Sequence, residues 1–342
     1  MRPKEALLGL VRMSGAFALF RAMNRRRIVV LTYHRFSHAP QAGRTSADAL
    51  TAQLDYLASH YTVLPLSMIE WHLREGRPLP PWTAAITIDD GYSDFYDIAW
   101  PALRRRKMPA TVFVVTDFVD GKRWIWTDKL PFLLSRTSAG DLAVEVAGQS
   151  ISGALSGESL RRQLASRING ILKDQPDGVK DEMIDEIAAQ CLVSLPAQPP
   201  GDRGSCTWEQ LREMKLAGIE IGSHTVTHPV LTRVTADRLR RELEQSRDRL
   251  EEMLGHPVML FCYPNGAYDR TVRDAVAQAG YRLAVTTDSG LNDATIDPLA
   301  IRRIGNEEQD LTHFQQSTSG FEEAKNQLRR AGYTTSSPVR IR

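Results

Sequence analysis

Two short clusters in the sequence combine residue types that bind cations and move protons. Residues 86–91 read ITIDDG, so an apolar, β-branched run ends in two adjacent carboxylates and a glycine. Strand interiors disfavour aspartate, and adjacent carboxylates raise each other's cost of ionisation unless a cation or a hydrogen-bond donor intervenes. Asp-Gly is also a common turn dipeptide. The stretch is therefore either a simple turn or part of a site where a cation or a hydrogen-bond donor stabilises the two carboxylates.

The second cluster, residues 223–229, reads SHTVTHP and places His224 and His228 four positions apart. One helical turn would bring both rings to the same side, and imidazoles paired in this way bind zinc and other borderline metals. A carboxylate from another strand end would complete a set of two histidines and one aspartate, which leaves positions open for water and substrate. One aspartate of residues 86–91 could complete the metal site while its neighbour accepts a proton from water.

The elements that position these clusters alternate along the chain. Short β-branched runs predict strands, and amphipathic stretches between them predict helices. The alternation implies parallel strands with right-handed crossovers, in either a (β/α) barrel of fewer than eight units or a doubly wound sheet. No glycine-rich nucleotide-binding motif follows a strand. The predicted strands are 28–32, 84–88, 110–115, 219–222, 258–263, 283–287 and 300–304, and the predicted helices are 49–59, 98–107, 208–217, 236–254, 269–279 and one that begins after Gly320.

The alternation is interrupted once, between the third and fourth strands. This interruption contains two polar helical patterns, around 158–173 and 178–190, and a proline-rich loop. We interpret it as an insertion in a single α/β domain. The predicted organisation is an amphipathic, basic segment at 1–27, a domain at 28–320 with its partly helical insertion at about 121–205, and a C-terminal helix and tail at 321–342.

Composition limits the partners and the compartment. The 342 residues carry a formal net charge of only +2, so the total charge does not predict a nucleic-acid partner. The three cysteines form no CxxC pair and mildly favour a reducing compartment. Residues 6–20 are too short to span a membrane, but the arginines at 25–27 suit anionic headgroups. Segment 1–27 is thus either a peripheral membrane contact or a helix packed on the domain. We expect a cytoplasmic location, at or near the inner face of the membrane, with the periplasm as the alternative.

The two clusters resemble motifs of the polysaccharide deacetylase family, the NodB-homology proteins of carbohydrate esterase family 4. The family pattern Thr-(Phe/Tyr)-Asp-Asp-Gly is similar to residues 87–91, and His-(Ser/Thr)-x-x-His matches residues 224–228. The similarity covers about 28–120 and 205–305. The Tyr-His-Arg that begins at Tyr33 also resembles the branch with exopolysaccharide deacetylases, as does the Tyr-Pro-Asn-Gly at residues 263–266.

The resemblance implies a distorted (β/α)7 barrel and a divalent metal ion, most often zinc. It implies Asp89 as the general base, and Asp90, His224 and His228 as the metal ligands. The expected reaction removes N-acetyl groups from the sugars of a polysaccharide, an oligosaccharide or a glycolipid. The alternatives are an O-acetyl esterase or deformylase acting on a glycan, and a glycan-binding module that has lost turnover.

The sequence departs from the family at two positions. Cys262 stands where the family has the arginine that orients the base, and Arg302 or Arg303 could replace it from the last strand. Only one of these two arginines can point inward from a strand. We identify no clear counterpart of the Leu-x-His near the C-terminus that is the usual source of the general acid, and we assign no role to His313. His34 is the candidate replacement, or else a histidine that supports the ligand loop.

Two further roles are predicted for residues at strand ends. The backbone N–H of Asn265 is the candidate donor to the oxyanion. Four aromatic residues could stack on sugar rings, although aromatic residues in apolar stretches are more often part of the core. These residues are Tyr33, Tyr92, Trp124 and Trp126.

Overall fold

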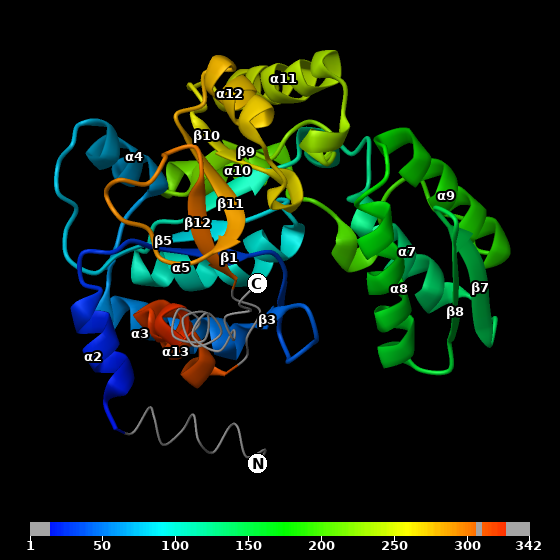
Figure 1. The fold of residues 1–342 in the computed structure, drawn as a ribbon, viewed down its shortest axis with the longest axis horizontal. Coiled ribbons are helices and arrows are strands. Elements are labelled where there is room, and N and C mark those ends of the chain that lie inside the picture. The colour runs from blue at the N-terminus through cyan, green and yellow to red at the C-terminus, as the bar shows by residue number, and fades with distance from the viewer. Residues whose placement is uncertain (1–13, 306–309, 326–342) are drawn as a thin grey trace, which may run out of the picture.

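The seven predicted strands form one closed parallel barrel. The computed structural model describes residues 14–305 and 310–325 of the chain (Figure 1). Around the barrel the order is β1, β12, β11, β10, β9, β6 and β5, and β5 pairs with β1 to close the ring. This confirms the (β/α)7 barrel, with strand ends that differ from the predicted ones by at most two residues. The strands are β1 (Val29–Tyr33), β5 (Thr83–Ile88), β6 (Thr111–Val114), β9 (Glu220–Ser223), β10 (Leu260–Cys262), β11 (Leu283–Ser289) and β12 (Ile301–Gly305).

Apolar side chains on both faces of the strands hold the barrel together. Successive side chains of a strand point to opposite faces, so neighbouring residues enter different parts of the core. Val30 belongs to the cluster in the barrel interior, whereas Val29 and Leu31 pack with the surrounding helices. Strands buried on both faces explain why these segments are almost continuously apolar in the sequence.

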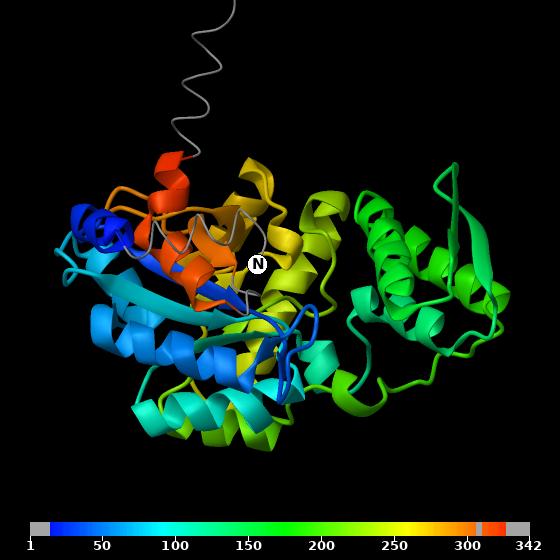
Figure 2. The same cartoon turned by 90° about the horizontal axis from the view of Figure 1, so that it is seen from below.

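Helices cover the outside of the barrel (Figures 1 and 2). Each of the five helices predicted between strands is present, although the segment 98–107 begins as a π-helix, η1 (Phe95–Ala99). Thr207 caps α10 with a full capping box, as its position in the sequence predicts. The five helices are α3 (Ala47–His60), α5 (Trp100–Arg106), α10 (Trp208–Leu216), α11 (Ala236–Leu254) and α12 (Arg270–Gln278).

Helix α4 (Leu66–Arg74) was not predicted, because it is short and lacks a capping side chain. Its N-terminal N–H groups, on Leu66 and Ser67, donate to the Glu220 carboxylate at 2.8 and 3.3 Å. A carboxylate at a helix N-terminus is favourable because it faces the positive end of the helix dipole. Leu66 and Ile69 join the interior cluster. A two-residue strand, β4 (Thr62–Val63), precedes α4 and pairs with β5.

The two ends of the described chain pack together. Helix α2 (Ala16–Met23) contacts α13 (Leu311–Ser319), a helix that was not predicted. The ring of Phe17 lies 5.4 Å from that of Phe321. The helix predicted after Gly320 is helical over 321–325, and its remaining residues lie outside the described ones. Residues 1–13 of the predicted N-terminal segment also lie outside them.

A side lobe stands beside the barrel, and both views show it apart from the barrel helices (Figures 1 and 2). Its helices α8 and α9 occupy the two helical patterns predicted within 121–205, and the lobe has an apolar cluster of its own. The hairpin was not predicted. Its sequence signals are the apolar residues at every second position of β7, Leu142, Val144 and Val146, and the glycine at 148. In the structure Ala147 and Gly148 form the turn with positive φ. The lobe consists of α7 (Trp126–Arg136), β7 (Asp141–Val146), β8 (Gln149–Ala154), α8 (Glu158–Leu172) and α9 (Asp177–Gln190).

Within residues 14–305 and 310–325, no helix has the length and apolar character needed to cross a bilayer.

Candidate active site

The C-terminal ends of the barrel strands open into one cleft of about 790 Å³. Loops after parallel strands meet at this end of a barrel, which is why sites form there. The six residues predicted to bind the metal or to take part in catalysis all line this cleft, although they come from four different strand ends. They are His34, Asp89, Asp90, His224, His228 and Asn265.

Asp90, His224 and His228 form a group that fits a metal ion. The Nε2 atoms of both histidines lie 3.5 Å from Oδ1 of Asp90. His224 Nδ1 is 2.8 Å from the carbonyl oxygen of Cys262, which leaves Nε2 free to bind. Two imidazoles and one carboxylate are a known catalytic ligand set for zinc, with a position left for water. The donor atoms present thus fit the divalent ion that the sequence predicts.

The histidine pair does not lie on a helical turn, and this expectation was wrong. Residues 224–230 form a loop in which Thr225 and His228 have positive φ values of 71° and 58°. The ring centroids of His224 and His228 nevertheless lie 4.7 Å apart. Backbone strain of this kind is common at functional sites, where the surrounding structure enforces it.

A buried glutamate holds this loop in place. Glu242 of α11 accepts hydrogen bonds from the backbone N–H groups of Val226 and Thr227, both at 2.9 Å. The hydroxyl of Thr225 accepts the N–H of His228 at 3.0 Å. Sequence analysis missed Glu242, since it lies in the middle of a highly charged helix and nothing marks it as different from its neighbours.

Burial dominates the electrostatics of the three candidate ligands. It raises the pKa of Asp90, although His224 and His34 act in the opposite direction. It lowers the pKa of His228 well below its usual value. Both shifts disfavour the charged form, because burial outweighs the nearby groups of opposite charge. A divalent cation between them would favour the carboxylate and the neutral imidazoles.

The turn that follows the two aspartates requires a glycine. Asp90 and Gly91 both have positive φ, 73° and 84°. A Cβ atom on Gly91 would lie 2.7 Å from Cγ1 of Val114, closer than real contacts allow. The dipeptide is therefore both a turn and part of the candidate site, because the turn directs the two carboxylates to different partners.

Arg303 holds the Asp89 carboxylate in place. Nη1 and Nη2 of Arg303 donate to the two carboxylate oxygens at 2.7 Å each. Arg303 is fully buried, whereas Arg302 is exposed, as the alternation along β12 requires. Burial acts to raise the pKa of Asp89, but Arg303 outweighs it and the pKa lies below its ordinary value. Of the two arginines considered from the sequence, Arg303 is therefore the one that contacts Asp89.

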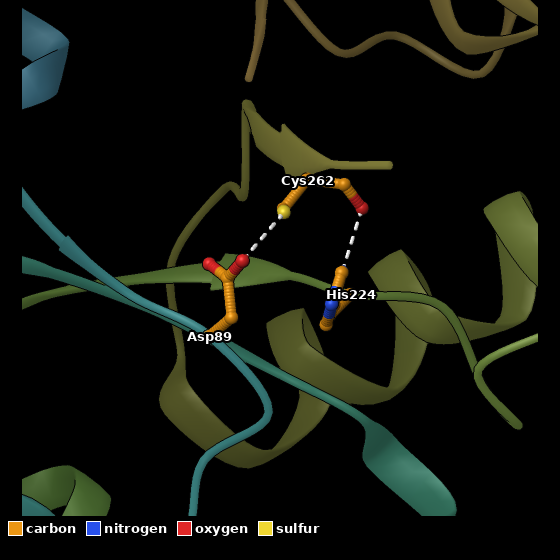
Figure 3. Close-up of side chains that lie close together, drawn as sticks. All are labelled: Asp89, His224 and Cys262. Atoms are coloured by element: carbon orange, nitrogen blue, oxygen red, sulfur yellow. Dashed lines mark hydrogen bonds between the residues drawn. The ribbon is translucent and has the colours of Figure 1, made fainter. Parts of the chain in front are cut away.

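Cys262 lies between Asp89 and His224 in Figure 3, and its thiol also contacts Arg303. Its Sγ lies 3.4 Å from Oδ2 of Asp89 and 3.3 Å from Nη2 of Arg303. Asp89, His224 and Cys262 are close enough to be considered as a second metal-binding group. Both oxygens of Asp89 are already paired, and burial raises the pKa of the Cys262 thiol well above its usual value. This second group is therefore the weaker candidate for a metal site.

His34 and Asn265 line the same cleft. His34 Nε2 lies 3.7 Å from Oδ2 of Asp89, and its side chain is 37% exposed. Asn265 has a φ of 56° in the short turn Pro264–Gly266. Gly266 is required in this turn, because a Cβ there would fall 1.9 Å from Oγ1 of Thr287. Both residues are thus placed to contact a molecule in the cleft.

The four aromatic residues considered for sugar stacking belong to the core. Each is at least nine-tenths buried, and none of them lines this cleft. Tyr92 instead donates to Asp128 of α7 at 2.8 Å, and the guanidinium of Arg35 stacks 3.9 Å from its ring centroid. Arg35 also pairs with Asp94 at 2.7 Å. The hydrogen bond between Tyr92 and Asp128, which the sequence did not predict, attaches the side lobe to the barrel.

Comparison with known proteins agrees with this geometry. The model of the polysaccharide deacetylase family matches residues 76–284. The chain belongs to this family. YxkH from Bacillus subtilis (strain 168), whose name assigns it to the polysaccharide deacetylases, is 30% identical over 104 residues; the match covers 30% of this chain and 37% of that relative.

Solved structures of other proteins share the fold. The Streptococcus pyogenes deacetylase PplD, in complex with acetate, has a TM-score of 0.58 at 20% identity, and the match covers 85% of this chain and 98% of that one. IcaB from Ammonifex degensii has a TM-score of 0.55 at 20% identity, covering 86% and 97%. At this level of identity the likeness establishes the barrel architecture.

Proposed function

We propose that this member of the polysaccharide deacetylase family hydrolyses the N-acetyl groups of an N-acetylated glycan or glycolipid. We further propose that the reaction depends on a divalent metal ion, and that this ion is zinc. The observation that carries the proposal is the pair of adjacent aspartates with separate partners. Asp90 lies with His224 and His228, while Asp89 is ionised and fixed by Arg303 beside them. A bound divalent ion would supply a polarised carbonyl and a more acidic water.

Three residues of the chain then supply the general base, the oxyanion donor and the general acid. Asp89 takes the proton of the attacking water, because its fixed carboxylate faces the same cleft as the ligand group. The backbone N–H of Asn265 donates to the oxyanion of the tetrahedral intermediate. His34 donates a proton to the departing amine, and its Nε2 lies in the same cleft, 3.7 Å from Oδ2 of Asp89.

Metal removal tests the proposal most directly. We expect acetate release from N-acetylated oligosaccharides to stop after chelation and to return with added zinc. His224→Ala and His228→Ala should each lose bound metal in elemental analysis. Their activity should fall by more than the roughly 10- to 100-fold that follows loss of a group merely supporting a ligand. His256→Ala, a change at a histidine outside the cleft, is the matched control.

Several results would contradict the proposal. Binding of oligosaccharides without acetate release at any metal loading would identify a glycan-binding module. Release of acetate only from O-acetyl esters, or release of formate, would leave the active-site assignment intact. The protein would then be an O-acetyl esterase or a deformylase. Full activity after complete metal removal would contradict the assignment of Asp90, His224 and His228 as ligands.

We also propose that the N-terminal segment contacts anionic membrane surfaces, and we keep the cytoplasmic location as a prediction. Leu19 and Met23 are 60% and 70% exposed and lie one turn apart on α2, close to the exposed Arg25 and Arg26. The protein should float with vesicles of anionic lipid, and Leu19→Glu with Met23→Glu should reduce this.

Leu216→Glu, at a site of 89% exposure on α10, is the control for the membrane contact. Equal flotation of the control and of the α2 variant, or no flotation of the unaltered protein, would contradict it.

A further inference from the structure

The candidate active-site cleft has a second wall, which comes from α8 of the side lobe. The residues that contribute to this wall are spaced by three or four positions, so they lie on one face of the helix. A cleft of about 790 Å³ falls within the range of sites that enclose a whole small ligand, so it has room for more than one acetamido group. The α8 wall consists of Arg162, Ala165, Ser166, Asn169, Gly170 and Lys173.

The α8 wall is positively charged. Arg162 and Lys173 are its two ionisable residues, and they lie at its opposite ends. The carboxylates that line the cleft are Asp89 and Asp90, both on the barrel side. Arg162 pairs with Glu158 at 3.0 Å, but an exposed pair within one helix is weak and can exchange partners. An anionic group bound beside α8 would therefore lie near the charges of Arg162 and Lys173, and the α8 wall has no carboxylate that would repel it.

The middle of the α8 wall is small and polar. Gly170 has no side chain and the space beside its Cα is open, so a sugar ring can lie close to the helix. Asn169 Nδ2 donates to the carbonyl oxygen of Thr127 at 2.9 Å, which fixes the orientation of the amide. Its Oδ1 has no hydrogen-bond partner although it is buried. Buried polar atoms without partners are rare, and Asn169 is a polar residue in the middle of this wall.

We propose that the α8 wall binds the unit next to the sugar that loses its acetyl group, and that it selects glycans in which this unit carries a carboxylate or a phosphate. The inference rests on the proposed function for the reacting end of the substrate. It adds a substrate class to that function: an anionic glycan, or a sugar attached through phosphate.

Equilibrium binding to three probes tests this inference at low ionic strength. The probes are a neutral tetrasaccharide of N-acetylglucosamine, a tetrasaccharide that alternates N-acetylglucosamine with glucuronate, and an N-acetylglucosamine 1-diphosphate ester. We expect at least one anionic probe to bind about tenfold more tightly than the neutral one, because each exposed charge contributes only a few-fold. The preference should weaken as salt is added.

The double variant Arg162→Glu with Lys173→Glu should lose this preference. Arg167→Glu is the matched control, since Arg167 is exposed on the same helix but does not line the cleft. A preference for the glucuronate probe alone would identify an acidic polysaccharide as the source, and a preference for the diphosphate alone would identify a phosphate-linked sugar. Either result supports the inference.

Equal affinity for all three probes would overturn the inference, as would a preference that survives in the double variant or disappears in Arg167→Glu. Acetate release from the neutral tetrasaccharide is measured in parallel. Because binding does not require turnover, absence of acetate release would contradict the proposed function while the binding comparison still decides the role of α8.

Discussion

Asp89→Asn should lose turnover by on the order of 10³-fold while the protein keeps its metal, since general acid–base groups contribute about 10²–10⁴-fold. The amide cannot accept the proton of the attacking water, but the ligand group of Asp90, His224 and His228 is untouched. The measurement is kcat for acetate release together with elemental analysis of the purified variant. Circular dichroism must show a folded protein, because the variant also removes one partner of a buried ion pair.

A companion variant separates the base from the acid. Asp89→Asn should impair the hydrolysis of both an N-acetyl sugar and an activated ester such as p-nitrophenyl acetate, because both need an attacking water. His34→Asn should impair the amide far more than the ester, because the nitrophenolate leaves without protonation. Wild-type kcat in Asp89→Asn would contradict the base assignment. An equal loss on both substrates in His34→Asn would indicate that this histidine supports the site rather than donates the proton.

The barrel could be predicted because its signals are local. Most of the strands are short, largely buried runs rich in apolar residues, such as β5, in which all six residues are buried. The adjacent aspartates and the histidine pair were identifiable for the same reason, since each cluster lies within a few positions of the chain. Parallel strands then bring residues that are distant in sequence to one end of the barrel.

The supports of the site could not be predicted, because each depends on contacts between distant segments. Arg303 contacts Asp89 although 214 positions separate them in the chain. The sequence alone could not decide between Arg302 and Arg303 as the partner. Only the strand's alternation and register determine which of the two points inward. Glu242 resembles the other acidic residues of α11 until the fold places it under the histidine loop. The α8 wall depends on where the side lobe stands, which no local pattern encodes.

Arg303→Met should destabilise the protein and move the acidic limb of its pH–activity profile to higher pH. The change leaves the Asp89 carboxylate buried without its cation, and breaking such a pair costs about 3–5 kcal/mol in the free energy of unfolding. In the wild type Arg303 lowers the pKa of Asp89. Without the guanidinium, burial raises that pKa, so Asp89 ionises and acts as a base only at higher pH.

The pH dependence of this loss has a definite sign. In the wild type, the depressed pKa of Asp89 contributes stability above the ordinary carboxyl pKa of about 3.9, and the contribution is lost as pH falls through the folded-state value. In Arg303→Met the pKa is raised instead, so the carboxyl destabilises the fold as pH rises above about 4. The difference in unfolding free energy between the two proteins should be largest near neutral pH and shrink toward pH 4.

Arg302→Met is the matched control for this experiment, because it removes the same side chain from the neighbouring, exposed position. A surface change of this kind should alter the free energy of unfolding by less than about 0.5 kcal/mol. Denaturant unfolding of both variants, with Asp89→Asn and the double variant completing a cycle, measures the coupling between Asp89 and Arg303. If Arg303→Met unfolds like Arg302→Met and keeps the wild-type acidic limb, the ion pair does not hold the base, and the role left open by Cys262 belongs to another group.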